Sequence, residues 1–418
     1  MSSSINKGVN LAYVFPIVIL CYTFSLLWGW IPRTHSLITL LIGLAVGVVV
    51  SYRYFTRIPM FYFLLYVVVL ALNVMANDHR YNSFASVFYE VIYLLLPSLM
   101  VFGLMNSDND KCATITIKAI LWMLIINAIG TFFVDTMFPG SIRAINAETR
   151  LTGNSSTAMY FYRFGLANYF LPHALPTIIP VLVMGIKYCD DRKKRWLLTV
   201  VLVACLLLVY FSGATTALLL AVVALLVAVF SSSKGGIRQI ILIVVISLIL
   251  IPVFSNDELM LSVLQQLDDI VNHEGYFHSK ILDFQDLIMY GETTGDVEAR
   301  ENLYTITINA IIGSPLFGVN TVIGGHSNLL DQWGYLGIVG WLPWLLFIIS
   351  QVRMSGRKLQ SSSKIFYVEG VLMAFLMLAI KSMAGWESWL FLFTVLPLLT
   401  RYCENDSKNP PVFSDQGT

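Results

Sequence analysis

Long runs of apolar residues recur along the whole of this chain, with polar segments between them. A helix needs about 20 mostly apolar residues to cross a bilayer, and runs of roughly this length occur throughout. The hydropathy pattern therefore predicts an all-α polytopic integral membrane protein with about twelve transmembrane helices. We expect these spans near residues 10–30, 36–52, 59–76, 84–105, 113–135, 165–186, 196–212, 214–231, 239–254, 333–351, 365–384 and 387–400.

The composition fits a bilayer protein. The sequence is 57% hydrophobic and only 12% charged, and its mean hydropathy is +0.74, whereas a soluble domain carries roughly 25% charged residues. The net charge of +1 argues against a nucleic-acid partner, which would favour a clustered basic surface.

Basic residues gather in the short loops on one side of the predicted spans. Arg53, Arg57, Lys187, Arg353 and Arg401 are examples. Because cytoplasmic loops are enriched in Lys and Arg, this side is predicted to be cytoplasmic, together with both termini. The tight turn at Ser212-Gly213-Ala214 is therefore expected to separate two spans. Only two spans place the basic residues before 196 and after 231 on the same, cytoplasmic side.

The whole chain, residues 1–418, is expected to form a single membrane domain with two sizeable external segments. The first covers 136–164, and the second is a long loop with amphipathic helices over 255–332, between spans nine and ten. Acidic residues far outnumber Lys280 and Arg300 in the long loop, so most of its surface is expected to be solvated.

Glu90 is the main ionisable candidate within the predicted spans, where a charge is costly. It lies about two turns from the external end of its span and needs a partner or a water-filled cavity. A structural role and a catalytic role both remain open for it.

The external side carries a second group of candidates, although the positive-inside pattern depletes that side of basic residues. Guanidinium groups bind phosphate through paired hydrogen bonds, and a neutral histidine can accept a proton from a hydroxyl. The alternative is that the arginines pair with carboxylates of the loop. The group consists of Arg143, Arg150, Arg163, Arg300 and His326.

The surroundings of Arg300 and His326 predict a folded structure. A helix is expected to begin near Asp296 and to end at Gly313-Ser314-Pro315, with apolar residues that can pack on the membrane domain (Leu303, Ile306, Ile308 and Ile311). A turn over 315–318 and the pair Gly324-Gly325 then lead to His326. This arrangement would bring Arg300 and His326 together across one cavity, and the alternative is a helical hairpin lying on the membrane.

The same stretch carries a family resemblance. Arg300, followed by GSPLFGV at 313–319, HSNLL at 326–330 and GYLG at 334–337, resembles the signature of the O-antigen ligase/polymerase superfamily. A second stretch, FSGATTALL at 211–219, is similar to another conserved segment of that family. There Thr215 stands where many members have an arginine.

The resemblance implies a fold like that of the lipid-linked-sugar (GT-C type) glycosyltransferases and a location in the bacterial inner membrane. It implies glycosyl transfer on the periplasmic face from an undecaprenyl-diphosphate-linked oligosaccharide, with inversion and without a nucleotide sugar, cofactor or metal. In a polymerase the acceptor is a new lipid-linked repeat unit, and in a ligase it is a sugar of lipid A-core. A polysaccharide chain-length regulator and membrane lipids are further partners that it suggests.

The resemblance also distributes roles among the candidates. His326 is expected to be the general base, Arg300 to bind the diphosphate, and Glu90 to be an alternative base or orienting group. With Thr215 in place of an arginine, Arg163 is expected to supply the second cation. The residues expected to contact the diphosphate or glycan are Arg163, Arg150, Arg143, Asn328 and Thr215.

Several functions remain open at this point. The form HSNLLDQWGYLG and the missing arginine favour an O-antigen polymerase, with an O-antigen ligase as the alternative. A flippase of lipid-linked oligosaccharides or another twelve-span transporter is a further alternative, although transporters bind near the midplane between matched halves. A purely structural membrane subunit would not need an arginine and a histidine around a Gly/Pro turn.

Overall fold

The computed structural model describes residues 10–24, 34–76, 84–106, 109–137, 166, 170–231, 257–270, 275–290, 295–319, 323–325, 327–381 and 385–404. Every element of regular structure in these ranges is helical. The predicted all-α class is therefore confirmed.

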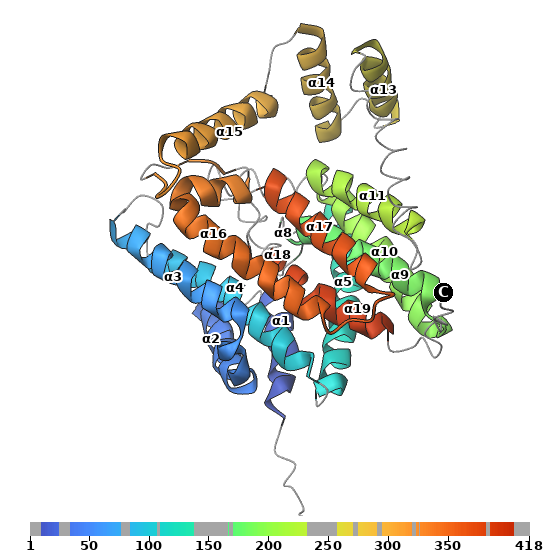
Figure 1. Ribbon diagram of the computed structural model, residues 1–418. Helices are drawn as coiled ribbons and strands as arrows, with labels where there is room; N and C mark the ends of the chain where they lie inside the picture. Colours follow the sequence, from blue (N-terminus) through green and yellow to red (C-terminus); the bar gives the residue numbers. More distant parts are fainter. Residues whose placement is uncertain are drawn as a thin grey trace, which may run out of the picture.

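The described helices fall into four groups along the chain (Figure 1). The first group is α1 Val14–Thr23, α2 Thr34–Val50, α3 Ile58–Ala76, α4 Phe84–Leu104 and α5 Asp110–Met137; the second is α8 Phe170–Ala174, α9 Ile179–Tyr188, α10 Arg192–Phe211 and α11 Thr215–Phe230; the third is α13 Asp257–Ile270, α14 Gly275–Tyr290 and α15 Gly295–Gly313; the fourth is α16 Asn328–Gly356, α17 Lys364–Ile380, α18 Trp386–Leu390 and α19 Leu396–Glu404. Short 3₁₀ turns are η1 Leu11–Tyr13, η3 Tyr52–Thr56 and η5 Leu175–Thr177, and η6 Phe391–Val395 is a π-helical turn.

Five described helices are long and apolar enough to cross a membrane, which makes this a membrane protein. They are α3, α4, α5, α10 and α16, and a sixth span results if α8–η5 and α9, bent by 45°, are taken as one. The count of twelve is not confirmed. The apolar stretches of α1, α2 and α11 are shorter than a full span, α17 has 17 residues, and the predicted span at 239–254 lies outside the described residues.

The turn predicted at Ser212-Gly213-Ala214 is confirmed as the boundary between two helices. α10 ends at Phe211 and α11 begins at Thr215. Gly213 has a φ of 64°, a conformation that glycine adopts without the steric penalty of a side chain. The Ser212 Oγ accepts a hydrogen bond from the Ala214 N–H at 3.3 Å, which closes the turn.

Buried aromatic side chains connect α16 to α18 and η6. Trp344 packs edge-on against Trp389 at 6.0 Å between ring centroids, and Phe347 packs against Phe393 at 5.7 Å. All four side chains are buried. α16 also packs along α3, so it is held on more than one side through its length.

The third group of helices stands outside the bundle, above it in the view of Figure 1. α13 packs on α14, and α15 packs on α16. The helix predicted from Asp296 to Gly313 is confirmed as α15, but its predicted packing face was partly wrong. Ile306 and Ile308 are 47% and 45% exposed, because the face toward α16 is the one that carries the buried Thr307.

Candidate active site

A break in α16 at Gly337 organises the end of the helix nearest to α15. Gly337 has φ 59° and ψ −177°, so the helical hydrogen-bond ladder stops there. The N–H groups of Ile338 and Val339 donate instead to the carbonyls of Pro315 (2.9 Å) and Leu316 (3.2 Å). The break therefore binds the turn that follows α15.

The two carbonyls that the break releases also find donors. The Gly334 oxygen accepts from the Val319 N–H at 3.0 Å, and the Tyr335 oxygen accepts from the Asn73 side chain of α3 at 3.2 Å. A buried backbone group left unpaired costs about as much as a lost hydrogen bond. The turn over 315–319 and α3 together satisfy the interrupted helix.

Glycine is required on both sides of this contact. A Cβ at Gly337 would lie 2.1 Å from the Leu316 oxygen, and one at Gly318 would lie 2.2 Å from the Tyr335 oxygen. Gly318 also has a φ of 75°. The GSPLFGV and GYLG stretches are thus two halves of one backbone junction, which explains the residue types at 318 and 337.

Gly324 and Gly325, which precede α16, lie against the carboxylate of Asp331. This side chain is 5% exposed, and it accepts hydrogen bonds from the Gly325 N–H at 3.0 Å and the Thr307 hydroxyl of α15 at 3.4 Å. A Cβ at Gly324 would lie 1.8 Å from Asp331 Oδ1. Asp331 therefore connects Gly325 to Thr307 of α15.

Further hydrogen bonds hold the start of α16 in place. Ser327 caps the helix by accepting from the Leu330 N–H at 3.2 Å, and the Asn328 N–H donates to the Lys381 carbonyl at 3.3 Å. The Tyr304 hydroxyl of α15 donates to the Ile380 carbonyl at 3.1 Å. The end of α17 is consequently bound to both α15 and α16.

Glu90 has the partners that its position in α4 requires. Its Oε1 accepts hydrogen bonds from the Tyr66 hydroxyl of α3 and from Gln332 Nε2 of α16 at 3.0 Å. Gln332 and Tyr66 are both buried. Three helices meet at one carboxylate, which supports a structural role for Glu90 and also fixes its orientation.

Asn328 is buried, with 5% of its surface exposed, and its Nδ2 has no hydrogen-bond partner among the described residues. Leaving such a donor unsatisfied costs about 1–3 kcal/mol, and unsatisfied groups in folded proteins call for an explanation such as an absent ligand or water.

The structure describes less of the other predicted site residues. Arg300 lies in α15, and it occupies the helical position two turns before Thr307 on the same face. Its side chain is not among those described. His326, Arg163, Arg150 and Arg143 lie outside the described residues. Whether Arg300 and His326 share one cavity therefore stays a prediction.

Thr215 is not joined to the α16 residues by any hydrogen bond in the described part of the chain. It is exposed at the first turn of α11, and α11 packs on α9 and α17. A small, mostly apolar pocket lies between α8, α17 and α18, lined in part by His173, Thr177 and Trp389. None of the predicted site residues lines it.

Sequence reasoning missed the residues that build this region: Asp331, Gln332, Thr307, Tyr66 and Asn73. A signal for the first two was present, since an adjacent acid and amide at the start of an apolar span are costly without partners. The remaining three are single polar residues in helices, and nothing in the sequence pairs them with α16. We call the set Glu90, Tyr66, Gln332, Asp331 and Thr307 the α16 polar cluster.

No protein-family model matches the chain, and no curated protein sequence matches it. What is established is the class: an all-α membrane protein with a hydrogen-bonded polar cluster at one end of α16. The superfamily resemblance rests on the motif residues alone.

Substitution of Gly337 by alanine should disrupt the junction. The backbone conformation is one that is essentially restricted to glycine, and the new methyl group would collide with Leu316. We expect a loss of about 2 kcal/mol or more in unfolding free energy, seen as a melting temperature several degrees lower for the purified protein in detergent.

Gly313→Ala is the matched control, because a Cβ there meets nothing within 4 Å. Its melting temperature should be unchanged or slightly raised. Equal melting temperatures for the Gly337→Ala and Gly313→Ala proteins would contradict the junction.

The bonds to Glu90 should be energetically coupled. Tyr66→Phe and Gln332→Leu each remove one donor from the carboxylate, and each should destabilise the protein by about 1–3 kcal/mol. Because both donors serve one oxygen, the double variant should deviate from the sum of the single variants by at least ~0.5 kcal/mol. Denaturation of the four proteins measures this, with Tyr62→Phe, one turn away on α3, as the control; strict additivity would refute the coupling.

Proposed function

We propose that this protein is a glycosyltransferase of the bacterial inner membrane that polymerises a lipid-linked surface polysaccharide, as an O-antigen polymerase does. The donor is the growing glycan on undecaprenyl diphosphate, and the acceptor is a new lipid-linked repeat unit. The observation that carries the proposal is the junction between 315–319 and the break at Gly337. Motif pieces that are separate in the sequence are in contact in the fold, as expected if they serve one site.

The proposed reaction requires little covalent chemistry from the protein itself. A hydroxyl oxygen of the acceptor sugar attacks C1 of the donor sugar, and the bond between C1 and the diphosphate oxygen breaks with inversion at C1. Undecaprenyl diphosphate leaves with the electron pair, and the hydroxyl proton passes to a base. Diphosphate is already a good leaving group, so catalysis consists of stabilising its charge and aligning the hydroxyl.

In this proposal His326 accepts the proton and Arg300 binds the diphosphate. The described neighbours of His326 support this assignment: Gly325 is bound to Asp331, and Ser327 caps α16. Asp331 is bound in turn to Thr307 on the helix that carries Arg300. A reacting group needs such a held backbone, because small displacements reduce catalysis strongly.

The remaining candidates take supporting roles. The buried amide of Asn328 can donate to a diphosphate or glycan oxygen. Glu90 orients Gln332 and Tyr66 more readily than it acts as a base, since its Oε1 already accepts two hydrogen bonds. Arg163 remains our proposed second cation in place of the arginine absent at Thr215, with Arg150 and Arg143 as alternatives.

The deciding assay uses the purified protein in nanodiscs with a synthetic undecaprenyl-diphosphate repeat unit as the only substrate. A ladder of glycan products, with release of undecaprenyl diphosphate, is the expected result. Transfer only after lipid A-core is added would replace the polymerase with a ligase. Movement of the substrate across the bilayer without any new glycosidic bond would replace both with a transporter.

His326→Ala and Arg300→Ala should each reduce the rate of ladder formation at least ~100-fold, the usual effect of losing a general base or a charge-stabilising donor. His278→Ala is the matched histidine control from the same external segment, and Arg192→Ala is an arginine control from the basic first turn of α10. Both controls should keep near-normal rates. A His326→Ala or Arg300→Ala protein with a normal rate would remove that residue from the mechanism.

A further inference from the structure

At the end of α16 opposite to the polar cluster, cations from distant parts of the chain gather around one aromatic ring. The ring is that of Phe102 in α4. The Arg57 guanidinium carbon lies 5.9 Å from the ring centroid, and Lys358 Nζ lies 5.3 Å from it. Arg57 precedes α3 and Lys358 follows α16, so tertiary packing alone brings them together.

A third cation joins this group at the neighbouring carbonyl of Met105. Arg401 Nη1 of α19 donates to that oxygen at 2.8 Å, and Lys358 Nζ donates to it at 3.4 Å. We call Arg57, Lys358 and Arg401 the cationic cluster. Its three members come from the start of α3, the end of α16 and from α19.

The cationic cluster is only partly neutralised by the protein residues that the structure describes. Arg401 pairs with Asp110 at 2.6 Å. In the described ranges neither Arg57 nor Lys358 has a carboxylate partner, and each is held by Phe102 rather than by a counter-charge. Partial burial, and then the charges of Arg401 and Arg57, lower the pKa of Lys358. Like charges held together in this way are stabilised by an anion.

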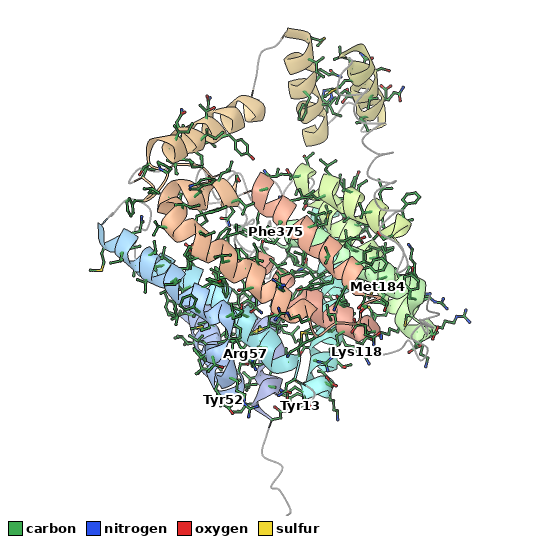
Figure 2. The ribbon with its side chains drawn as sticks, in the orientation of Figure 1. Tyr13, Tyr52, Arg57, Lys118, Met184 and Phe375 are labelled. Carbon is green, nitrogen blue, oxygen red and sulfur yellow. The ribbon has the colours of Figure 1, made fainter. Side chains whose placement is uncertain are left out.

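The surface beside Arg57 is apolar. Phe55 in η3 is 40% exposed, and Ile58 and Phe61 at the start of α3 are 66% and 60% exposed. Figure 2 shows Arg57 near Tyr52 at the lower end of the bundle, away from α13 to α15. Since the basic loops also lie at this end, it is the side expected to face the cytoplasm. Cations next to exposed apolar side chains fit the boundary between head groups and acyl chains.

We propose that Arg57, Lys358 and Arg401 bind the phosphate of an anionic phospholipid in the leaflet on the side of the basic loops, with its acyl chains against Ile58 and Phe61. Arginine presents a planar fork to phosphate oxygens, and lysine adds a compact charge. The lipid would bridge the ends of α3, α16 and α19. This site does not depend on the glycosyltransferase proposal.

The test is lipid binding by the full-length protein, delipidated in a neutral detergent. Dioleoylphosphatidylglycerol should raise the melting temperature of the unaltered protein and appear as a bound species in native mass spectrometry. Dioleoylglycerol, which has the same acyl chains without phosphate, should do neither. Inorganic phosphate at the same concentration should give less than half of the shift; an equal shift would mean that the site takes a soluble anion, and would overturn the lipid assignment.

The decisive variant is Arg57→Gln/Lys358→Gln, compared with Arg192→Gln/Arg353→Gln, which removes the same charge from exposed basic positions outside the cluster. The first should weaken apparent lipid affinity about tenfold or more, because two charged contacts with the phosphate are lost. The second should change it less than about twofold. Equal losses in the two proteins would show general surface attraction and refute the site.

If the cluster variant proves too unstable to purify, Arg57→Gln and Lys358→Gln are measured singly, with Lys358→Arg as the conservative form. Each glutamine variant should weaken binding at least about threefold, while Lys358→Arg should retain it. Binding unaffected by both single glutamine substitutions would also refute the site.

Discussion

The exchange of backbone hydrogen bonds between residues 315–319 and the break at Gly337 is the interaction on which the proposed site depends. A helix in a membrane cannot leave backbone groups unpaired, because no water is available to satisfy them. α16 is interrupted nevertheless, and each group released by the interruption has a partner in the turn or in α3. The turn after α15 is therefore held at the break by backbone hydrogen bonds. Without it, α15 would have only side-chain contacts to hold it against the bundle.

Charged side chains are stabilised in different ways at the two ends of α16. At the end near α15, the carboxylates of Glu90 and Asp331 accept hydrogen bonds from hydroxyl, amide and backbone donors. At the other end, cations are held by an aromatic ring and a carbonyl. Both arrangements fix charged groups in place. We interpret the first as the frame of a reaction site and the second as an anchor for lipid.

The sequence was sufficient for the features that depend on local pattern. The all-α membrane class, the boundary between α10 and α11, and the extent of α15 followed from hydropathy and turn residues. The special importance of glycine near 313–337 also showed in the sequence. The reason for it did not, because the Cβ contacts at Gly318 and Gly337 are made to residues of another segment. Partners such as Tyr66, Asn73 and Thr307 were missed for the same reason: pairing across helices is set by tertiary packing, and a lone polar residue in an apolar helix does not indicate which neighbour it meets.

A structure of the protein in nanodiscs with undecaprenyl diphosphate, determined by cryo-electron microscopy, would show where the diphosphate binds. We expect density for the diphosphate at the end of α16 near α15, within hydrogen-bond distance of Arg300 and the Asn328 amide. We also expect the turn over 315–319 to remain seated on the break at Gly337. Diphosphate bound near the middle of the bundle, or an α15 detached from α16 in the bound state, would contradict this account.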